Sequence, residues 1–185
     1  MVEDRNRVCP VLLAGPLDNK IRRLVHDPEK ILAPFVKEGM TVMDVGCGPG
    51  YFTIELAKIV GSKGKVFAVD LQEGMLNKIR DKIKGAYLEQ IIHPIKCGKE
   101  KIVMPEKVDF ILAFYMVHEV PDKKNFFNEL KSFLTEGGMI LIVEPPVHVS
   151  KKDFAATLNF AQNVGLKAGA GPKLFMNHSA ILTLI

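Results

Sequence analysis

The sequence predicts an α/β fold in which a mostly parallel sheet carries helices on both faces. Short apolar runs of the kind found in buried strands alternate with amphipathic, helix-length patterns along most of the chain. That alternation is typical of β-α-β units, which build parallel sheets. Ligands of such folds bind outside the carboxyl ends of the strands, where the winding of the chain reverses. The loops expected to hold a site therefore follow Val45, Val69, Lys96, Phe114 and Val143.

The composition fits one folded domain over residues 1–185. A chain of 185 residues and 20.5 kDa, 48% hydrophobic and 25% charged, is neither disordered nor a stapled mini-protein. Its net charge of +4 is too small to indicate a nucleic-acid partner. No apolar run approaches the ~20 residues that cross a bilayer, so no membrane partner is expected. The charged N-terminus does not resemble a secretory signal, and the expected location is cytoplasmic.

The N-terminal segment, residues 1–37, precedes the first predicted strand. Within it, residues 17–37 have amphipathic helical spacing, with Pro28 and Pro34 as breaks. This helical segment could form a lid over the site. Arg22, Arg23 and His26 lie on this segment, and the arginines are expected to form a solvated charged face.

Strands and helices then alternate to the C-terminus. Six strands are predicted from apolar and β-branched runs: 41–45, 65–69, 90–96, 108–114, 139–143 and 174–185. Four helices are predicted from apolar spacing: 51–60, 72–84, 122–134 and 151–164. Asp122 is a favourable N-cap for the third helix, and Gly137 with Gly138 is expected to end it. Pro94 weakens the prediction of its strand, because proline cannot donate a ladder hydrogen bond.

Three glycines recur at alternate positions directly after the first predicted strand, in the run DVGCGPG (44–50). Glycine adopts positive φ angles and lets a ligand approach the backbone closely. The helix that begins near Gly50 offers unpaired N–H groups and a partial positive charge, which stabilise a carboxylate or a phosphate. Gly46, Gly48 and Gly50 are therefore candidates for an anion-binding loop. The alternative is a tight strand-to-helix turn without a ligand.

Two nucleotide-binding motifs are excluded at this loop. The dinucleotide fingerprint G-x-G-x-x-G/A fails because Tyr51 stands where its third small residue belongs. The phosphate-binding loop G-x-x-x-x-G-K-S/T fails because no lysine follows Gly50. The pattern that remains is D-x-G-x-G-x-G, which begins at Asp44.

Asp70 ends the next predicted strand, in the run KVFAVDLQEGML. A carboxylate at the tip of the neighbouring strand can accept hydrogen bonds from both hydroxyls of a ribose. Leu71 and Met75 could pack on the faces of an attached base. The alternative for Asp70 is an N-cap of the following helix, a common role for aspartate. Its place next to the glycine loop favours ribose binding.

Several of these segments together resemble the class I S-adenosylmethionine-dependent methyltransferases: residues 42–53, Asp70, FYMVHEVP (114–121) and EGGMILIVEPP (136–146). The resemblance covers about residues 30–185 and is greatest to the small-molecule type related to quinone-biosynthesis methyltransferases. It implies a three-layer, Rossmann-like α/β/α fold with a seven-stranded, mostly parallel sheet. Residues 174–185 would form an antiparallel last strand inserted beside the fifth.

The same resemblance implies which residues hold S-adenosyl-L-methionine as the cofactor. The glycine loop would hold its methionine part and Asp70 its ribose, with Leu71 beside the adenine. The family often has an aspartate after the third strand, and none stands at 97–100 here, so backbone N–H groups would contact the adenine. The implied cofactor-binding residues are Asp44, Gly46, Cys47, Gly48, Gly50, Asp70, Leu71, Met75, Gly98, Lys99, Ala113 and Phe114.

The acceptor is expected to face the loops after the fourth and fifth strands. Methyl transfer needs alignment and exclusion of water, and it needs a base only when the acceptor carries a proton. His118 is the candidate catalytic base, because its ordinary pKa of about 6.5 suits proton transfer near neutral pH. The alternative is a histidine that only orients its loop. The candidate acceptor-binding residues are Tyr115, His118, Glu144 and His148, with Glu119 in the same loops.

The cysteines and the remaining histidines do not favour a metal. Cys47 and Cys97 are expected to face the cofactor and could bind a soft metalloid, but no C-x-x-C spacing supports such a site. Together with Cys9 they form an unpaired set, typical of reduced thiols. The histidines lack the spacing of zinc ligands, and no metal is expected.

The predicted function is methyl transfer to a small or medium acceptor. The acceptor pocket would use the N-terminal segment and the loops after the fourth and fifth strands, or a second subunit in a homodimer. A protein acceptor fits the same open site. The alternatives are a cofactor-binding protein or subunit without transfer activity, a metalloid-methylating enzyme, and a nucleotide-sugar or dinucleotide enzyme on a similar fold. The acceptor atom does not follow from the sequence, because this fold hosts many chemistries.

Overall fold

The structure is a computed structural model that describes residues 26–98 and 101–185. Residues 17–25 of the predicted helical segment 17–37 lie outside the described residues. Four residues singled out in the sequence also lie outside them: Cys9, Arg22, Arg23 and Lys99.

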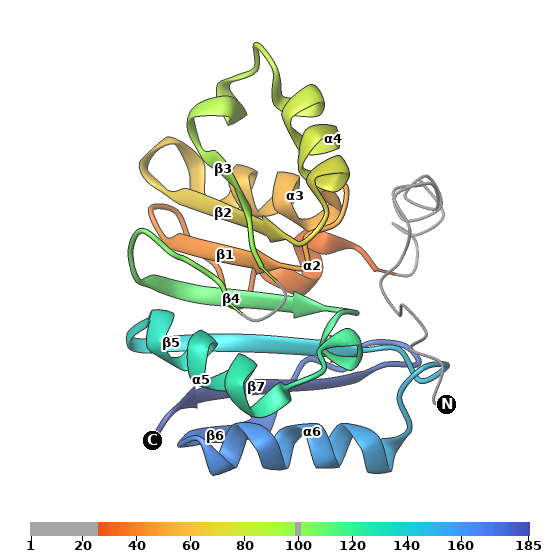
Figure 1. The fold of residues 1–185 in the computed structure, drawn as a ribbon. Coiled ribbons are helices and arrows are strands. Elements are labelled where there is room, and N and C mark those ends of the chain that lie inside the picture. Colours follow the sequence, from red (N-terminus) through yellow and green to blue (C-terminus); the bar gives the residue numbers. More distant parts are fainter. Residues whose placement is uncertain (1–25, 99–100) are drawn as a thin grey trace.

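Seven strands form one sheet: β1 (Thr41–Val45), β2 (Lys65–Asp70), β3 (Ile92–Lys96), β4 (Val108–Phe114), β5 (Leu134–Glu144), β6 (Leu166–Ala170) and β7 (His178–Leu184). Their order across the sheet is β3-β2-β1-β4-β5-β7-β6. β1 to β5 are parallel, and β7 is antiparallel to both of its neighbours. The predicted fold class is confirmed, including the antiparallel strand inserted beside the fifth (Figure 1).

Helices cover both faces of this sheet. They are α2 (Pro28–Leu32), α3 (Tyr51–Val60), α4 (Glu73–Ile83), α5 (Lys123–Phe133) and α6 (Lys151–Asn163). Residues of α2, α3 and α4 share one buried cluster with the sheet, and residues of α5 and α6 share another. Asp122 caps α5 as predicted, since its side chain accepts a hydrogen bond from the Asn125 N–H at 2.9 Å.

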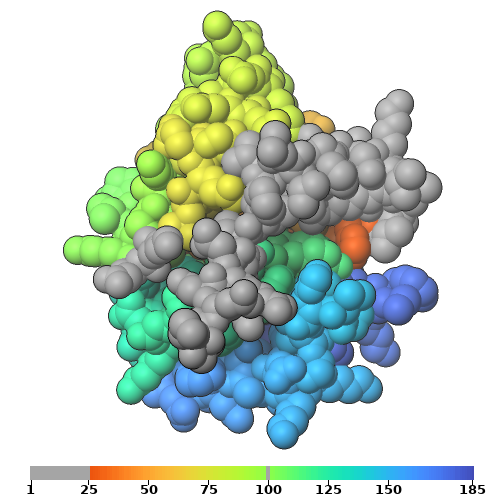
Figure 2. All heavy atoms as spheres, turned by 45° about the vertical axis from the view of Figure 1, so that its right-hand side comes forward, coloured from red at the N-terminus to blue at the C-terminus, as the bar shows by residue number. Residues whose placement is uncertain are grey.

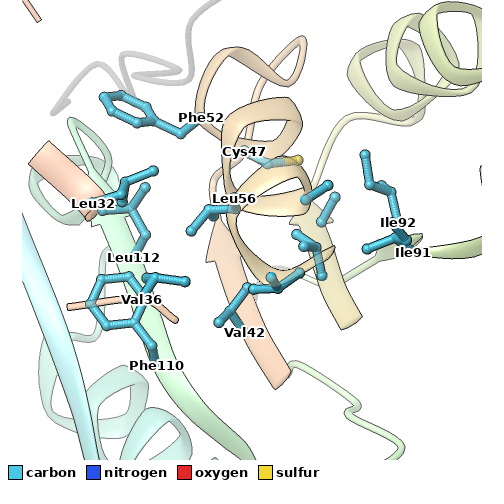
Figure 3. Close-up of a cluster of buried hydrophobic side chains, with 14 of the residues drawn as sticks. Leu32, Val36, Val42, Cys47, Phe52, Leu56, Ile91, Ile92, Phe110 and Leu112 are labelled. Carbon is cyan, nitrogen blue, oxygen red and sulfur yellow. The ribbon is translucent and has the colours of Figure 1, made fainter. Parts of the chain in front are cut away.

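Alternate residues of the central strands supply the two cores, because successive side chains of a strand point to opposite faces. In β1, Val42 belongs to the core under α3, and Met43 belongs to the core under α5. Figure 3 shows the first core, in which Val42 and Leu112 of the sheet lie near Leu32 and Leu56 of the helices. Burial of this apolar surface is the main source of the fold's stability.

The structure corrects one predicted helix end. α5 ends at Phe133, and the prediction that Gly137 and Gly138 end it is wrong. Leu134 is already extended, with φ −72° and ψ 140°, and begins β5. The glycines lie inside β5, where its register against β4 shifts and Gly137 has a φ angle of 80°. The pair makes a bulge in a strand, another place that glycine favours.

The residue pattern did not identify β6. Its sequence, LKAGA, is short and contains alanine and glycine, which have weak β propensity. The strand lies at the edge of the sheet and pairs only with β7. Its extended conformation therefore depends on pairing with β7, which follows it in the sequence.

The parallel register places the predicted site loops together. Val45 pairs with Val69 of β2 and with Ala113 of β4, so the loops after these three strands start side by side.

Figure 2 shows the molecule from another direction, with α4 (yellow to yellow-green) at one end and α6 (light blue) at the other. Within residues 26–98 and 101–185, no helix is long and apolar enough to cross a membrane.

Candidate functional site

The loop after β1 folds onto the end of β2. The N–H groups of Gly46 and Cys47 donate hydrogen bonds of 2.8 and 3.1 Å to the Val69 carbonyl oxygen. Gly46, Gly48 and Gly50 have φ angles of 69°, 53° and 89°, a region that L side chains rarely adopt. The predicted glycine loop is therefore a strand-to-helix turn that only glycine forms without strain.

Close packing accounts for two of the three glycines. A Cβ at Gly46 would lie 2.8 Å from the side chain of Met116, and a Cβ at Gly50 would lie 2.8 Å from that of Ile79. No atom lies within 4 Å of a Cβ placed on Gly48. The fold itself thus requires glycine at 46 and 50, whereas the bare backbone at 48 borders open space that a ligand can enter.

Asp44 fixes the glycine loop from below. Its carboxylate is 3% exposed and accepts a hydrogen bond of 2.6 Å from the Thr53 hydroxyl. This bond joins the end of β1 to the first turn of α3, and the glycine loop lies between these two elements.

Asp70 joins the end of β2 to the glycine loop. The Gly48 N–H donates to Oδ2 at 2.9 Å, and the Gln72 N–H donates to Oδ1 at 2.8 Å. Burial raises the pKa of this carboxyl, and the backbone N–H bonds act in the opposite direction. Asp70 is not the N-cap of α4, which begins at Glu73 after Gln72. The carboxylate is a fixed hydrogen-bond acceptor beside the loop.

A cavity of about 720 Å³ opens along this edge of the sheet. Ligand pockets for small molecules commonly have volumes of about 300–1,000 Å³. The predicted cofactor-binding residues that line it are Asp44, Gly46, Cys47, Gly48, Asp70, Leu71, Met75, Gly98 and Phe114. Two predicted residues do not line it: Gly50, which caps α3, and Ala113, which is fully buried in β4.

One wall of the cavity was not identified from the sequence. Asp122, Asn125, Phe126 and Glu129 line it from α5 and from the residue before that helix. Their spacing of i, i+3, i+4 and i+7 places them on one helix face. That spacing was the signal available, but only the assembled fold shows that the face borders the cavity.

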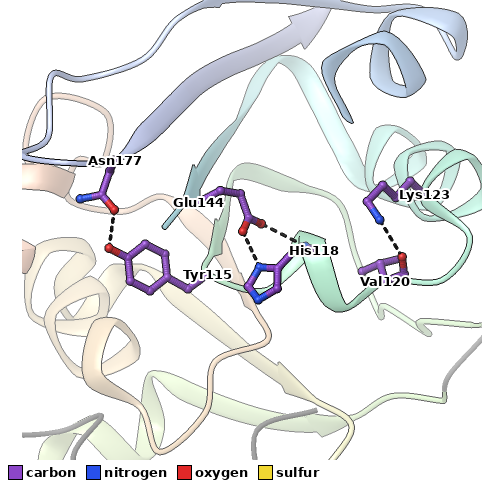
Figure 4. A network of polar contacts seen from close by, with 6 residues as sticks. All are labelled: Tyr115, His118, Val120, Lys123, Glu144 and Asn177. Carbon is purple, nitrogen blue, oxygen red and sulfur yellow. Dashed lines mark hydrogen bonds and ion pairs between the residues drawn. The ribbon is translucent and has the colours of Figure 1, made fainter. Parts of the chain in front are cut away.

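His118, Glu144 and His148 form a cluster at the ends of β4 and β5, which we call the histidine–glutamate cluster. Glu144 Oε2 lies 2.5 Å from His118 Nδ1, and Oε1 accepts the backbone N–H of His118 at 3.2 Å (Figure 4). The ring of His148 stacks on that of His118, with centroids 5.5 Å apart. The hydrogen bond to Glu144, which is 1% exposed, raises the pKa of His118, and burial acts in the opposite direction.

The histidine–glutamate cluster lies beside the cavity rather than in its wall. His118, Glu144 and His148 do not line the cavity, whereas Met116 and Glu119, on either side of His118 in sequence, do. Tyr115, the remaining predicted acceptor residue, also lines it. The structure thus brings Tyr115 to the predicted cofactor residues and places the other three next to them.

Two free cysteines border the cavity. Cys47 and Cys97 line the cavity and are free. Burial is the main cause that raises the pKa of Cys47 well above its ordinary value and that of Cys97 to about 11. In the described part of the chain, no three His, Cys, Asp or Glu side chains form a group that could hold a metal ion.

The sequence matches a known family and several curated proteins. A family model described as "Methyltransferase domain" matches residues 36–169. The chain is 30% identical to the ubiquinone/menaquinone biosynthesis C-methyltransferase UbiE of Vibrio vulnificus over 109 residues, which are 58% of this chain and 42% of that protein. It is 30% identical to the demethylmenaquinone methyltransferase of Staphylococcus aureus over 132 residues, or 70% of this chain and 54% of that protein. The chain thus spans about half the length of these curated relatives.

Solved structures share the fold over nearly the whole chain. An S-adenosylmethionine-dependent methyltransferase of Aquifex aeolicus is 31% identical, with a TM-score of 0.81 over 95% of this chain and 100% of that chain. A protein of Methanococcus maripaludis, titled a putative S-adenosyl-L-methionine-dependent methyltransferase, gives a TM-score of 0.76 at 19% identity, over 100% of this chain and 97% of that chain. At that identity the second match shows the fold alone.

Proposed function

The chain belongs to the class I S-adenosylmethionine-dependent methyltransferases, and we propose that it transfers the cofactor's methyl group to a small-molecule acceptor. The observation that carries the proposal is the meeting of two features at one cavity. The bare Gly48 backbone borders open space, and the buried Asp70 carboxylate is held beside it by two backbone N–H groups.

The residues of the cavity fit the three parts of this cofactor. Each oxygen of Asp70 accepts one backbone N–H and keeps a further lone pair for a ribose hydroxyl. Leu71 and Met75 offer apolar surface to the adenine. The glycine loop and the N-terminus of α3 offer N–H groups to the carboxylate of the methionine part. When bound, the cofactor supplies an activated methyl group whose leaving group is a neutral thioether.

The chain itself must then align the acceptor, exclude water and take up a proton. We assign Phe114 and Tyr115 to the wall that excludes water. We assign His118 as the general base. With its Nδ1–H bonded to Glu144, the lone pair of Nε2 is the one available for an acceptor proton. Glu144 fixes this tautomer and the ring orientation.

A base at this position supports an acceptor that loses a proton as it gains the methyl group. The curated relatives are named as a ubiquinone/menaquinone biosynthesis C-methyltransferase and a demethylmenaquinone methyltransferase. These names support a small organic acceptor for this chain as well. The free thiols of Cys47 and Cys97 support our proposal that the protein works in a reducing compartment.

Binding and transfer can be tested on the purified chain. We expect calorimetry to show S-adenosylhomocysteine binding at one site and no binding of NAD. Protein incubated with methyl-labelled S-adenosylmethionine and a fractionated cell extract should yield a labelled small molecule, which mass spectrometry identifies. Binding without any labelled product in any fraction would favour a cofactor-binding protein over an enzyme. Tight NAD binding would overturn the cofactor assignment.

A further inference from the structure

Three segments that are distant in sequence meet at the hydroxyl of Tyr115. This hydroxyl lies 3.0 Å from His26 Nε2. It also donates a short hydrogen bond to Asn177 Oδ1, which Figure 4 shows. Asn177 Nδ2 lies 3.0 Å from the same His26 nitrogen. We call His26, Tyr115 and Asn177 the Tyr115 contact group. They join three places in the fold: His26 lies two residues before α2, Tyr115 directly follows β4, and Asn177 directly precedes β7.

Neighbouring residues fix the members of the Tyr115 contact group in place. His26 is 8% exposed, and its carbonyl oxygen accepts a hydrogen bond of 2.8 Å from the Tyr51 hydroxyl. The His26 imidazole meets Phe114 edge to face, with centroids 5.5 Å apart. Tyr115 has a φ angle of 61°, which costs a non-glycine residue free energy and persists only where neighbours fix the conformation.

The loop that carries Asn177 is itself closed by hydrogen bonds. Asn177 Nδ2 donates to the Phe175 carbonyl oxygen at 2.6 Å, and the Asn177 N–H donates to the Leu174 carbonyl oxygen at 3.2 Å. Ser179 Oγ donates to the Pro172 carbonyl oxygen at 2.6 Å. These bonds tie the loop to itself, and Asn177 ties it to Tyr115.

Only one member of the Tyr115 contact group reaches the cavity. Tyr115 lines it, whereas His26 and Asn177 do not. We infer that His26 and Asn177 are positioning residues, which orient the Tyr115 side chain in the cavity wall and thereby couple the loop 171–177 to cofactor binding. The inference rests on the proposed function, because it requires that the cavity binds the cofactor. Tyr115 is the link through which both residues act.

Amide hydrogen exchange, with S-adenosylhomocysteine as the probe, tests this coupling without an acceptor. We expect the ligand to slow exchange in 171–177 at least threefold in the wild-type protein, although no residue of that loop lines the cavity. In Tyr115→Phe, which removes only the shared hydroxyl, the ligand should still bind and the slowing in the loop should disappear. Asn177→Ala should give the same result from the other end, and it serves as the test if Tyr115→Phe does not fold.

Two substitutions serve as matched controls. Tyr87→Phe removes a hydroxyl from a tyrosine that is 63% exposed, and Asn77→Ala removes an amide on α4 that accepts a hydrogen bond from Arg80. Both should keep the ligand-dependent slowing in residues 171–177. The inference alone would be overturned if wild-type protein binds the ligand without slower amide exchange in that loop. It would also be overturned if the slower exchange survives in both Tyr115→Phe and Asn177→Ala. Wild-type protein that does not bind the ligand would overturn the proposed function, and the inference with it.

Discussion

At the edge of the sheet formed by the ends of β1 and β2, a backbone loop is bonded to the carboxylate of Asp70, whereas at the ends of β4 and β5 the Tyr115 side chain of the cavity wall contacts side chains from distant segments. At the first edge, Gly48 and Asp70 are bonded across 22 residues of sequence. At the second, Tyr115 is bonded to Asn177 across 62 residues and lies against His26 across 89. One edge is a local turn, and the other is a tertiary assembly.

From this difference we infer that the first edge holds the cofactor and that the second selects the acceptor. A turn that needs positive φ angles at three positions allows few other sequences, so it suits a ligand common to a whole family. A cluster of side chains on loops can be exchanged without loss of the fold, so it suits a variable acceptor. We therefore expect substitutions at the first edge to act on cofactor affinity and substitutions at the second edge to act on turnover.

The largest expected effect is on turnover at the second edge. His118→Gln should lower the rate of labelled-product formation by about 100-fold or more, as loss of a general base does. It should leave the affinity for S-adenosylhomocysteine within about twofold, because His118 does not line the cavity. His93→Gln, a histidine of β3 packed against Phe67, is the matched control and should leave both quantities unchanged.

The pH dependence of turnover sharpens the same test. The Glu144 hydrogen bond raises the pKa of His118, so the base form accumulates only as pH rises above the ordinary histidine range. Wild-type turnover should therefore increase with pH through that raised pKa. In Glu144→Gln the increase should move to lower pH, and the maximal rate should fall as the ring loses its orientation. A profile that does not move would remove Glu144 as the partner of the base.

Asp70→Asn should have the next largest effect, and it should act on affinity. Loss of a charged acceptor for the ribose hydroxyls should weaken S-adenosylhomocysteine binding by about 30-fold, measured by calorimetry at pH 7.5. The control is Asp109→Asn, since Asp109 likewise accepts two hydrogen bonds, from the Thr41 N–H and the Thr135 hydroxyl. Asp109 does not line the cavity, so its variant should lose stability while keeping the affinity.

The raised pKa of Asp70 adds a second measurement to this prediction. Because protonation removes the charged acceptor, wild-type affinity should fall as pH is lowered through that pKa. The Asn variant should show no such fall. Equal affinity of wild-type and Asp70→Asn protein at pH 7.5 would contradict the ribose assignment and leave the comparison between the two edges without its first half.

The contrast between the two edges also explains what could be predicted from the sequence. The glycine loop and Asp70 follow directly from strand ends, and the parallel register then places them together. The class of fold followed from the alternation of elements. The histidine–glutamate cluster was predicted only as separate candidates, because the approach of Glu144 to His118 depends on β4 and β5 being neighbours in the sheet.

The features that were missed depend on neighbours that no local pattern reveals. β6 is extended because it pairs with β7, and its LKAGA sequence carries little preference of its own. Glycines end helices in many proteins. Here α5 has already ended before Gly137 and Gly138, and the pair forms a bulge within β5. Asn177 was not singled out, because its role exists only once the chain brings it to Tyr115.

The smallest expected effect separates the two demands placed on the glycine loop. Gly48 and Gly85 have φ angles of 53° and 71°, and no atom lies within 4 Å of a Cβ added to either. Alanine at each position should therefore lower the free energy of unfolding by a similar amount, about 1 kcal/mol, through backbone strain alone.

Only Gly48 lines the cavity, so the two variants should differ in cofactor affinity. Gly48→Ala should weaken S-adenosylhomocysteine binding by roughly three- to tenfold, since its methyl group keeps the ligand from the backbone. Gly85→Ala, in the turn after α4, should bind as the wild-type protein does. If both variants lose stability equally and neither loses affinity, Gly48 serves only the turn, and the backbone at this edge is then structural rather than part of the binding site.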